Sequence, residues 1–122
     1  FRAVADATDL PVVLYNVPGR TGSNMEAATT LRLAEVPTIV AMKEASGNLT
    51  QLQDILRDRP ESFALLSGDD ASAFALMAMG GDGVISVVSN ATPALMARLC
   101  DATLTGDLPA ARAIQARLTP WM

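Results

Sequence analysis

The sequence predicts an α/β fold of about four βα units, and it favours half of a (β/α)8 TIM barrel. Short apolar segments begin near residues 10, 38, 63 and 83, and a helical pattern follows each within a few residues. This alternation is typical of parallel strands joined by right-handed crossovers. The segments are uniformly apolar, which predicts that both faces of the sheet are covered. The 122 residues are half of the roughly 250 residues of a full barrel.

An open, doubly wound sheet is the alternative architecture for such a pattern. That fold would be favoured by a glycine-rich dinucleotide fingerprint placed between a strand and the next helix. The glycine-rich stretch Gly80–Gly83 precedes a strand instead of following one. The half barrel therefore remains the favoured prediction.

The first βα unit is predicted from a strand over Leu10–Asn16 and a helix over Met25–Ala34. The strand segment is apolar, and Asp9 introduces it. Ser23 and Glu26, three residues apart, resemble a capping box at the start of the helix.

The second unit starts with a strand over Thr38–Lys43, which is apolar and partly β-branched. Glu44–Gly47 breaks that pattern and is predicted to be a loop. A helix is then predicted over Leu49–Arg57, because Asn48 can cap it, with Gln51 three residues later.

The third unit is predicted from a strand over Phe63–Ser67 and a helix over Ala71–Met79, which Asp69 and Asp70 can cap. A fourth strand is predicted over Gly83–Val88. Two helices complete the pattern, each with a proline in its first turn. They run from Pro93 to Leu104 and from Pro109 to Leu118, after the possible caps Thr92 and Asp107.

Composition excludes several classes of function. Half of the residues are hydrophobic and the net charge is −4, so neither disorder nor binding to nucleic acid or an anionic membrane is expected. No apolar run reaches the roughly 18 residues that span a bilayer. Histidine is absent and Cys100 is the one cysteine, which excludes serine–histidine catalysis, an internal disulfide and the usual zinc sites.

The two ends of the sequence favour a piece of a larger protein. Phe1–Ala7 has no initiator methionine and resembles the tail of a helix that is already under way. Trp121 lies next to the last residue, where further chain would be needed to cover it. We therefore expect one domain segment, residues 1–122, that belongs to a longer barrel.

Lys43 is the chief candidate for catalysis, and it is the only lysine in the chain. It stands at the end of a strand that is predicted to be buried, where water is scarce. A free lysine amine has a pKa of about 10.4, so roughly one in 2,500 is an uncharged nucleophile at pH 7. Desolvation can lower such a pKa by about three units, and the amine can then form a Schiff base with a ketone. The alternative is a lysine that extends from the strand end into solvent.

Other polar groups follow the same strand ends, which is where barrel enzymes carry their chemistry. Tyr15 ends the first strand, Gly68 and Asp69 follow the third, and Arg20 lies in a Pro-Gly loop after the first. Each residue also has an ordinary structural explanation: a tyrosine that packs, a solvated arginine, a helix cap, a turn glycine. Their occurrence at successive strand ends favours a site.

Four stretches of the sequence are distinctive: Tyr15–Thr21 (YNVPGRT), Lys43–Leu49 (KEASGNL), Ser67–Asp70 (SGDD) and Gly80–Ser86 (GGDGVIS). They resemble the signature sequences of the 4-hydroxy-tetrahydrodipicolinate synthase (dihydrodipicolinate synthase) family. The resemblance covers essentially all of the chain as the C-terminal half of the barrel. N-acetylneuraminate lyases and keto-deoxy-sugar aldolases share the tyrosine and the lysine, but the Pro-Gly-Arg-Thr and Lys-Glu-Ala-Ser-Gly sequences favour the synthase.

The resemblance implies a pyruvate Schiff base on Lys43, whose enamine attacks L-aspartate 4-semialdehyde in the diaminopimelate route to lysine. Tyr15 would carry protons, and Arg20 would hold the carboxylate of the semialdehyde. The backbone of Ile85 would help to seat pyruvate, and Gly68 would leave room beside it. No cofactor is expected beyond the covalent imine. The resemblance also implies a cytoplasmic homotetramer, built as a dimer of dimers.

In the family, a threonine pair and a second tyrosine complete the proton relay, and they come from the first half of the barrel. We therefore expect this polypeptide alone to be inactive. Two alternatives remain open at this point. The protein could be another pyruvate-dependent aldolase of the same superfamily, or the chain could be a non-catalytic structural fragment.

Overall fold

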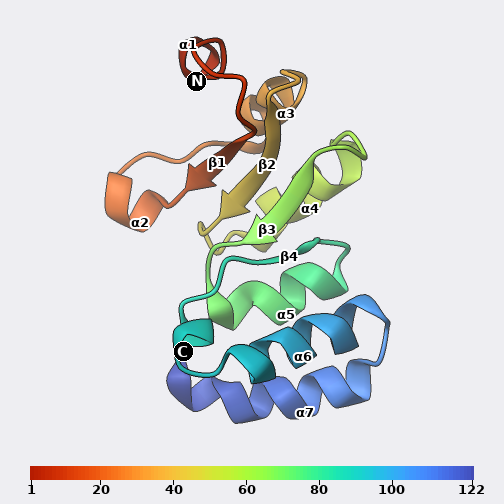
Figure 1. Cartoon of the computed structure of the whole chain (residues 1–122). Helices are drawn as coiled ribbons and strands as arrows, with labels where there is room; N and C mark the ends of the chain where they lie inside the picture. The colour runs from red at the N-terminus through yellow and green to blue at the C-terminus, as the bar shows by residue number, and fades with distance from the viewer.

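The computed structural model describes all 122 residues and shows a parallel four-stranded sheet with helices between its strands (Figure 1). The strands lie in the order β1-β2-β3-β4, each beside its neighbour along the chain. The predicted α/β alternation is therefore confirmed. A doubly wound sheet reverses its strand order, whereas a barrel wall does not, so this order favours the half barrel.

The elements agree with most of the predicted segments. Their bounds are α1 Arg2–Ala5, β1 Val12–Asn16, α2 Pro18–Thr21, α3 Ala27–Ala34, β2 Ile39–Glu44, α4 Leu49–Asp58, β3 Ala64–Ser67, α5 Asp70–Ala78, β4 Gly83–Val84, the 3-10 helix η1 Val88–Asn90, α6 Pro93–Leu104, α7 Leu108–Leu118 and the 3-10 helix η2 Thr119–Trp121. None of these helices is both long and apolar enough to cross a bilayer.

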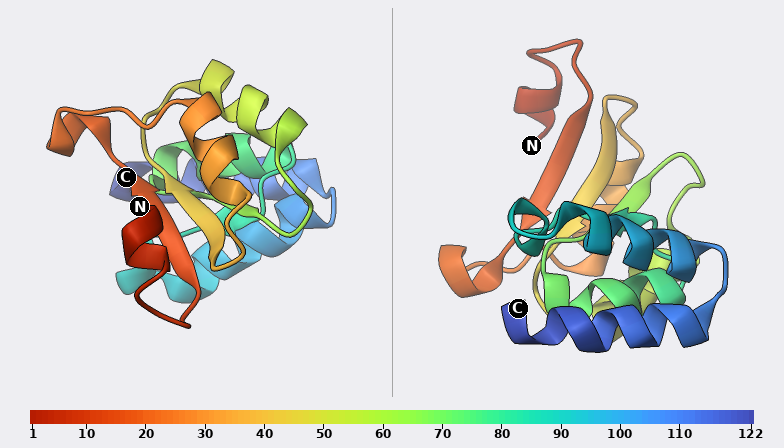
Figure 2. Two further views of the ribbon diagram at one scale, coloured as in Figure 1. Left: turned by 90° about the horizontal axis from the view of Figure 1, so that it is seen from above. Right: turned by 60° about the horizontal axis from the view of Figure 1, so that its bottom comes forward.

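Helices α3 and α4 cover one face of the sheet, where the larger hydrophobic core lies (Figure 2). Leu14, Met42 and Leu65 point from three adjacent strands into this core, and all three are almost fully buried. Ile55 of α4 packs against them and is fully buried. This burial is the main stabilising contribution of the first three units.

A second core joins α5, α6 and α7, which lie beside one another in Figures 1 and 2. Its fully buried members are Ala73 of α5, Leu99 of α6, and Ala111 and Leu118 of α7. Of the side-chain caps predicted for α6 and α7, one forms. Asp107 accepts a hydrogen bond from the amide of Ala110, whereas no side chain caps α6.

The opposite face of the sheet has no helix over it, so the prediction that both faces are covered is wrong for this chain. Val13 and Tyr15 on β1 are each 47% exposed, and Ile85 just beyond β4 is 41% exposed. In a (β/α)8 barrel the helices form an outer ring and the other face of the sheet lines the interior. The exposed apolar face is thus the one that a complete barrel encloses.

The helix predicted over Met25–Ala34 begins two residues later, at Ala27, and its predicted capping box does not form. The reason is that Met25 is held in place by other elements. Its amide donates to Oδ1 of Asn16 at 2.9 Å, and its carbonyl accepts from Nε2 of Gln51 at 3.0 Å. These bonds keep the approach to α3 non-helical.

The fourth strand ends at Val84, four residues short of the predicted Val88. The amides of Val87 and Val88 donate to Oδ2 of Asp70, at 2.9 and 3.0 Å, instead of to a neighbouring strand. Asp69 occupies the N-cap position of α5, as predicted, but its side chain makes no capping hydrogen bond. The Asp70 carboxylate does not cap the helix either, because it binds this loop. Asp70 therefore anchors the segment that carries Ile85.

Arg59 and Asp82 tie the connection before β3 to the one before β4. Arg59 pairs with the Asp82 carboxylate and donates to the carbonyl of Phe63 at 2.9 Å. Asp82 also accepts from the amide of Leu65 at 2.7 Å. Burial raises the pKa of Asp82, but the hydrogen bonds from Arg59 and Leu65 and the charge of Arg59 outweigh it, so the pKa lies below its ordinary value of 3.8.

We therefore predict a pH-dependent loss of stability when Asp82 is replaced by asparagine. A carboxylate whose pKa is lower in the folded state stabilises that state above its unfolded pKa, and the effect disappears as the pH falls through the folded pKa. Asp82→Asn should cost about 1 kcal/mol at pH 7, the upper end for a partly exposed ion pair, and less at pH 2, where protons compete for the carboxylate. Urea unfolding of parent and variant at equal protein concentration measures this, and an equal difference at both pH values would contradict it.

Candidate active site

Tyr15 and Lys43 lie side by side on the exposed face of the sheet. The parallel register of β1 and β2 pairs the two residues directly. Nζ of Lys43 lies 4.2 Å from the centre of the Tyr15 ring, which is a cation–π contact. The pairing places a phenol next to an amine, so that a proton donor stands beside a nucleophile.

Gly68 follows β3 and leaves space for the Lys43 side chain. A Cβ atom at Gly68 would lie 2.8 Å from Cβ of Ala45 and 3.0 Å from Cγ of Lys43. Contacts this short force a neighbouring group to move, and one of those groups is the candidate nucleophile. Gly68 is therefore a position where any side chain would displace Lys43 or the backbone after β2.

Arg20 lies in the single-turn helix α2, which the sequence predicted only as a loop. Its guanidinium makes no ion pair in the structure and is exposed to solvent. Together with Tyr15, Lys43 and Gly68 it lines a hollow of about 410 Å³. The hollow thus combines an amine, a phenol and an unpaired cation, which suits a substrate with a carbonyl and a carboxylate group.

Ile85 is less closely associated with this group than the other candidates. It follows β4 and does not line the hollow. Its amide donates to the carbonyl of Ser67 at 2.9 Å, so its own carbonyl is the backbone group left for a ligand. Its side chain points outward with 41% exposure, on the uncovered side of the sheet.

The surroundings of Lys43 differ from the water-poor site that its strand predicts. Lys43 is partly exposed and Tyr15 is almost half exposed, because no helix covers this face. Desolvation of the amine by these 122 residues is therefore incomplete. The structure also contains no group of three or more histidine, cysteine, aspartate or glutamate side chains that could hold a metal ion.

Polar residues directly behind the candidates were missed by the sequence analysis. Asn16 follows Tyr15, and Glu44 follows Lys43 inside β2 instead of in the predicted loop. Both are 2% exposed and point to the helix-covered face. The signal available in the sequence was the two-residue period of a strand. Successive side chains point to opposite faces, so Asn16 and Glu44 must point away from the face that carries Tyr15 and Lys43.

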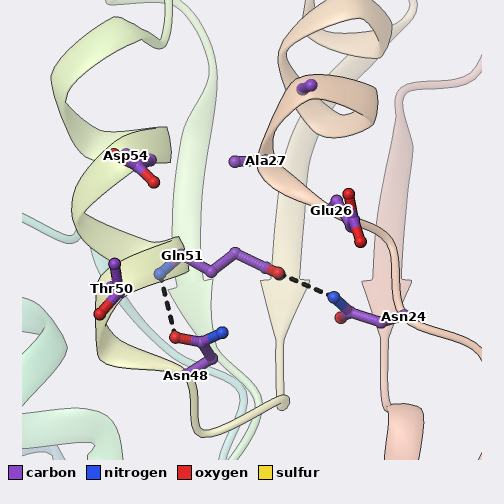
Figure 3. A pocket seen from close by; sticks show the side chains of 8 residues that line it. Asn24, Glu26, Ala27, Asn48, Thr50, Gln51 and Asp54 are labelled. Atoms are coloured by element: carbon purple, nitrogen blue, oxygen red, sulfur yellow. Dashed lines mark hydrogen bonds between the residues drawn. The ribbon is translucent and has the colours of Figure 1, made fainter.

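A second hollow, of about 310 Å³, lies between the N-terminal ends of α3 and α4 (Figure 3). Its lining is polar and includes Glu26, Asp54 and Gln51. None of the candidate site residues contributes to it. It is thus separate from the hollow that contains Lys43.

Comparison with known proteins agrees with this geometry. The model of the dihydrodipicolinate synthetase family matches residues 1–122. The 4-hydroxy-tetrahydrodipicolinate synthase of Nitrosomonas eutropha is 52% identical over 118 residues, which are 97% of this chain and 40% of that protein. The chain therefore spans about two fifths of the length of the curated relatives it matches.

Solved structures give the same result. Dihydrodipicolinate synthase from Cyanidioschyzon merolae, with lysine bound, superposes with a TM-score of 0.93 at 48% identity, covering 97% of this chain and 41% of that one. The chloride-inhibited synthase from Acinetobacter baumannii, complexed with pyruvate, superposes with a TM-score of 0.94 at 38% identity, covering 98% and 41%. The four strands are accordingly half of a barrel, and the chain belongs to the dihydrodipicolinate synthetase family.

Proposed function

We propose that the full-length protein containing this chain is a 4-hydroxy-tetrahydrodipicolinate synthase. It is a lyase that condenses pyruvate with L-aspartate 4-semialdehyde in the diaminopimelate route to lysine. The observation that carries the proposal is the pairing of Lys43 with Tyr15, with Nζ 4.2 Å from the ring centre, in a chain of this family. The pyruvate complex of the Acinetobacter baumannii relative supports the identity of the first substrate.

In the proposed reaction, the Lys43 amine attacks the ketone carbon of pyruvate, and water leaves as the imine forms. Loss of a proton from the methyl group gives an enamine. The enamine carbon bonds to the aldehyde carbon of the semialdehyde, and the aldehyde oxygen takes up a proton. The amino group of the product then attacks the imine carbon, which closes the ring and releases Lys43. The covalent imine is the only prosthetic chemistry that this scheme needs.

Three other residues have proposed roles beside Lys43. Tyr15, whose ring lies next to Nζ, carries protons to and from the imine and the aldehyde oxygen. Arg20 holds the carboxylate of the semialdehyde, a role that suits an unpaired guanidinium at the rim of the hollow. The carbonyl of Ile85 helps to seat pyruvate, while Gly68 leaves the space that the Lys43 side chain needs.

The rest of the full-length protein supplies what this chain does not. The proposal includes a threonine pair and a second tyrosine from that part, which complete the proton relay. Covering the exposed face would also remove water from Lys43 and favour the uncharged amine. We further propose a cytoplasmic homotetramer, and we expect the 122 residues alone to be inactive.

Reductive trapping tests the proposed function. The full-length protein is incubated with pyruvate and borohydride, digested and analysed by mass spectrometry. The peptide that contains Lys43 should gain the mass of reduced pyruvate, and omission of pyruvate is the control. No mass gain, or a gain at another residue, overturns the mechanism.

Another pyruvate-dependent aldolase of the superfamily is the second candidate, because such an enzyme would also use Lys43 and Tyr15. We predict that Arg20→Ala lowers kcat/KM for the semialdehyde at least about 100-fold, since a charged hydrogen-bonding partner of the substrate is lost. Pyruvate trapping should change less than about threefold, because the Lys43–Tyr15 pair remains. Steady-state kinetics with the semialdehyde measure this, and unchanged kinetics would favour an aldolase with a different acceptor.

A purely structural fragment is the third candidate. The coverage of 40% of the relatives' length favours it for the isolated polypeptide. The intact mass of the natural protein decides between the two situations. A mass near 12.8 kDa identifies a real fragment, and about twice that mass or more identifies a full-length synthase.

A further inference from the structure

A buried polar cluster lies directly behind the Tyr15–Lys43 pair. Its members are Asn16, Glu44 and Gln51, which are 2%, 2% and 7% exposed. Asn16 and Glu44 come from the ends of β1 and β2, and Gln51 comes from the first turn of α4. Asn16 directly follows Tyr15, and Glu44 directly follows Lys43. Because neighbouring residues of a strand point to opposite faces, the cluster lies on one face of these two strand ends and the candidate pair lies on the other.

The Glu44 carboxylate is the centre of this cluster, and all of its hydrogen-bond donors are neutral groups. It accepts hydrogen bonds from Nδ2 of Asn16 at 3.1 and 3.2 Å, from Nε2 of Gln51 at 3.0 Å and from the amide of Ser46 at 2.5 Å. No lysine or arginine forms an ion pair with it. A buried carboxylate is costly unless donors satisfy it, so removal of any one donor should disturb the whole arrangement.

Asn16 also closes the loop that carries Arg20. Its Oδ1 accepts from the amide of Met25 at 2.9 Å, and its Nδ2 donates to Oδ1 of Asn24 at 2.9 Å. The chain leaves the sheet after β1, forms α2 and then returns past β1 to α3 (Figure 1). One side chain therefore fixes both ends of the Arg20 loop.

Gln51 connects this loop base to α4. Its Nε2 donates to the carbonyl of Met25 at 3.0 Å as well as to Glu44. Its Oε1 accepts from Nδ2 of Asn24 at 2.9 Å, a contact that is visible in Figure 3. The helix, the loop and both strand ends are thus held by one set of directional bonds.

We propose that Asn16, Glu44 and Gln51 are positioning residues, which fix Lys43, Tyr15 and the Arg20 loop relative to one another. This inference rests on the proposed function, because it assigns the three residues to that site. On the same face of these two strands, the residues two positions earlier are apolar, namely Leu14 and Met42. Apolar burial alone would stabilise the strand ends at lower cost, but it does not set a direction, whereas hydrogen bonds do.

Two matched substitutions on α4 test the proposal in the full-length protein. Gln51→Glu places a carboxylate against Glu44, whereas Gln53→Glu makes the same chemical change two residues away at an exposed position. We expect Gln51→Glu to slow pyruvate trapping on Lys43 at least about tenfold and to raise the KM for the semialdehyde, since small misplacements of reacting groups cost one to two orders of magnitude. Gln53→Glu should change both by less than about twofold.

A reciprocal exchange distinguishes positioning from simple stability. Asn16→Asp removes the amide donor to Glu44 and sets two carboxylates against each other, and Glu44→Gln replaces one of the two acceptor oxygens with an amide donor. The double variant restores a donor and an acceptor between the same two strand ends, with their roles reversed. It should trap pyruvate at least about fivefold faster than either single variant at a temperature where all three are folded. Lack of any recovery overturns the pairing that the proposal requires.

Hydrogen exchange gives a readout that needs no activity. In Asn16→Asp the amides of residues 17–24 should exchange at least about tenfold faster, while the amides of α6 and α7 keep their parent rates. If Gln51→Glu lowers only the melting temperature, with trapping, KM and loop exchange unchanged, the three residues are merely structural and the proposal is overturned. If the parent protein traps no pyruvate, the proposed function fails, and the loop exchange still decides whether the cluster fixes the loop.

Discussion

Replacement of Lys43 by arginine in the full-length protein will abolish imine formation with pyruvate and lower turnover at least about 10³-fold. Lys43 makes a cation–π contact with the Tyr15 ring at 4.2 Å. Arginine is also positively charged and can make the same type of contact. A guanidinium, however, remains protonated at all usable pH values and cannot act as the nucleophile. The expected loss is therefore chemical instead of structural.

Borohydride trapping and steady-state turnover measure this loss, and an added lysine serves as the control. Arg112 lies exposed on α7 and does not line the hollow, so Arg112→Lys supplies a second amine outside it. In the double variant Lys43→Arg/Arg112→Lys, these 122 residues again contain one lysine. We expect no mass gain from reduced pyruvate on the peptide that contains this introduced lysine. Turnover within about tenfold of the parent in Lys43→Arg would exclude the Schiff-base mechanism.

The juxtaposition of Lys43 and Tyr15 could be predicted from the sequence, because it follows from topology. Parallel strands end at the same edge of a sheet, and adjacent βα units place their strand ends side by side. That both residues lie near the ends of adjacent strands follows from the strand bounds, which apolar patterning gives to within two residues. Their direct pairing is set by the register of β1 on β2.

The buried cluster behind these residues could not be predicted in the same way. Hydrogen bonds between Asn16, Glu44 and Gln51 join segments that lie 7 to 28 positions apart along the chain. Their formation depends on the register of β1 on β2 and on the placement of α4, which local propensity does not specify. The late start of α3 at Ala27 was missed for the same reason, since side-chain bonds from other elements hold the preceding residues.

The length of the fourth strand shows a similar limit of local patterns. Val84–Val88 is β-prone sequence apart from Ser86, yet the strand consists of Gly83 and Val84 alone. The Asp70 carboxylate binds the amides of Val87 and Val88, and a side chain from another element thereby replaces the ladder. Apolar patterning predicts which residues avoid water, but it does not predict which partner takes their backbone bonds.

The 122 residues alone will not behave as a soluble monomer. The exposed face of the sheet carries Val13 and Tyr15, each 47% exposed, and Ile85 and Val87 continue it at 41% and 71%. Strands β1 and β4 are open edges, each with one unpaired side. The chain therefore presents an apolar face together with two edges at which another chain can pair.

The magnitude of the effect makes association the expected result. Burial of apolar surface contributes about 25 cal/mol per Å², so about 400 Å² left in water forgoes on the order of 10 kcal/mol. Domains of ordinary size hold only about 5–15 kcal/mol of net stability, so this loss is comparable to the whole. The isolated chain should therefore dimerise or aggregate, whereas co-expression with the remaining segment of the full-length protein should yield a folded complex. Size-exclusion chromatography with light scattering checks both samples. A monodisperse species of 12.8 kDa with a cooperative melt would show that the exposed face needs no partner, and that the two cores on the helix side suffice to hold the fold.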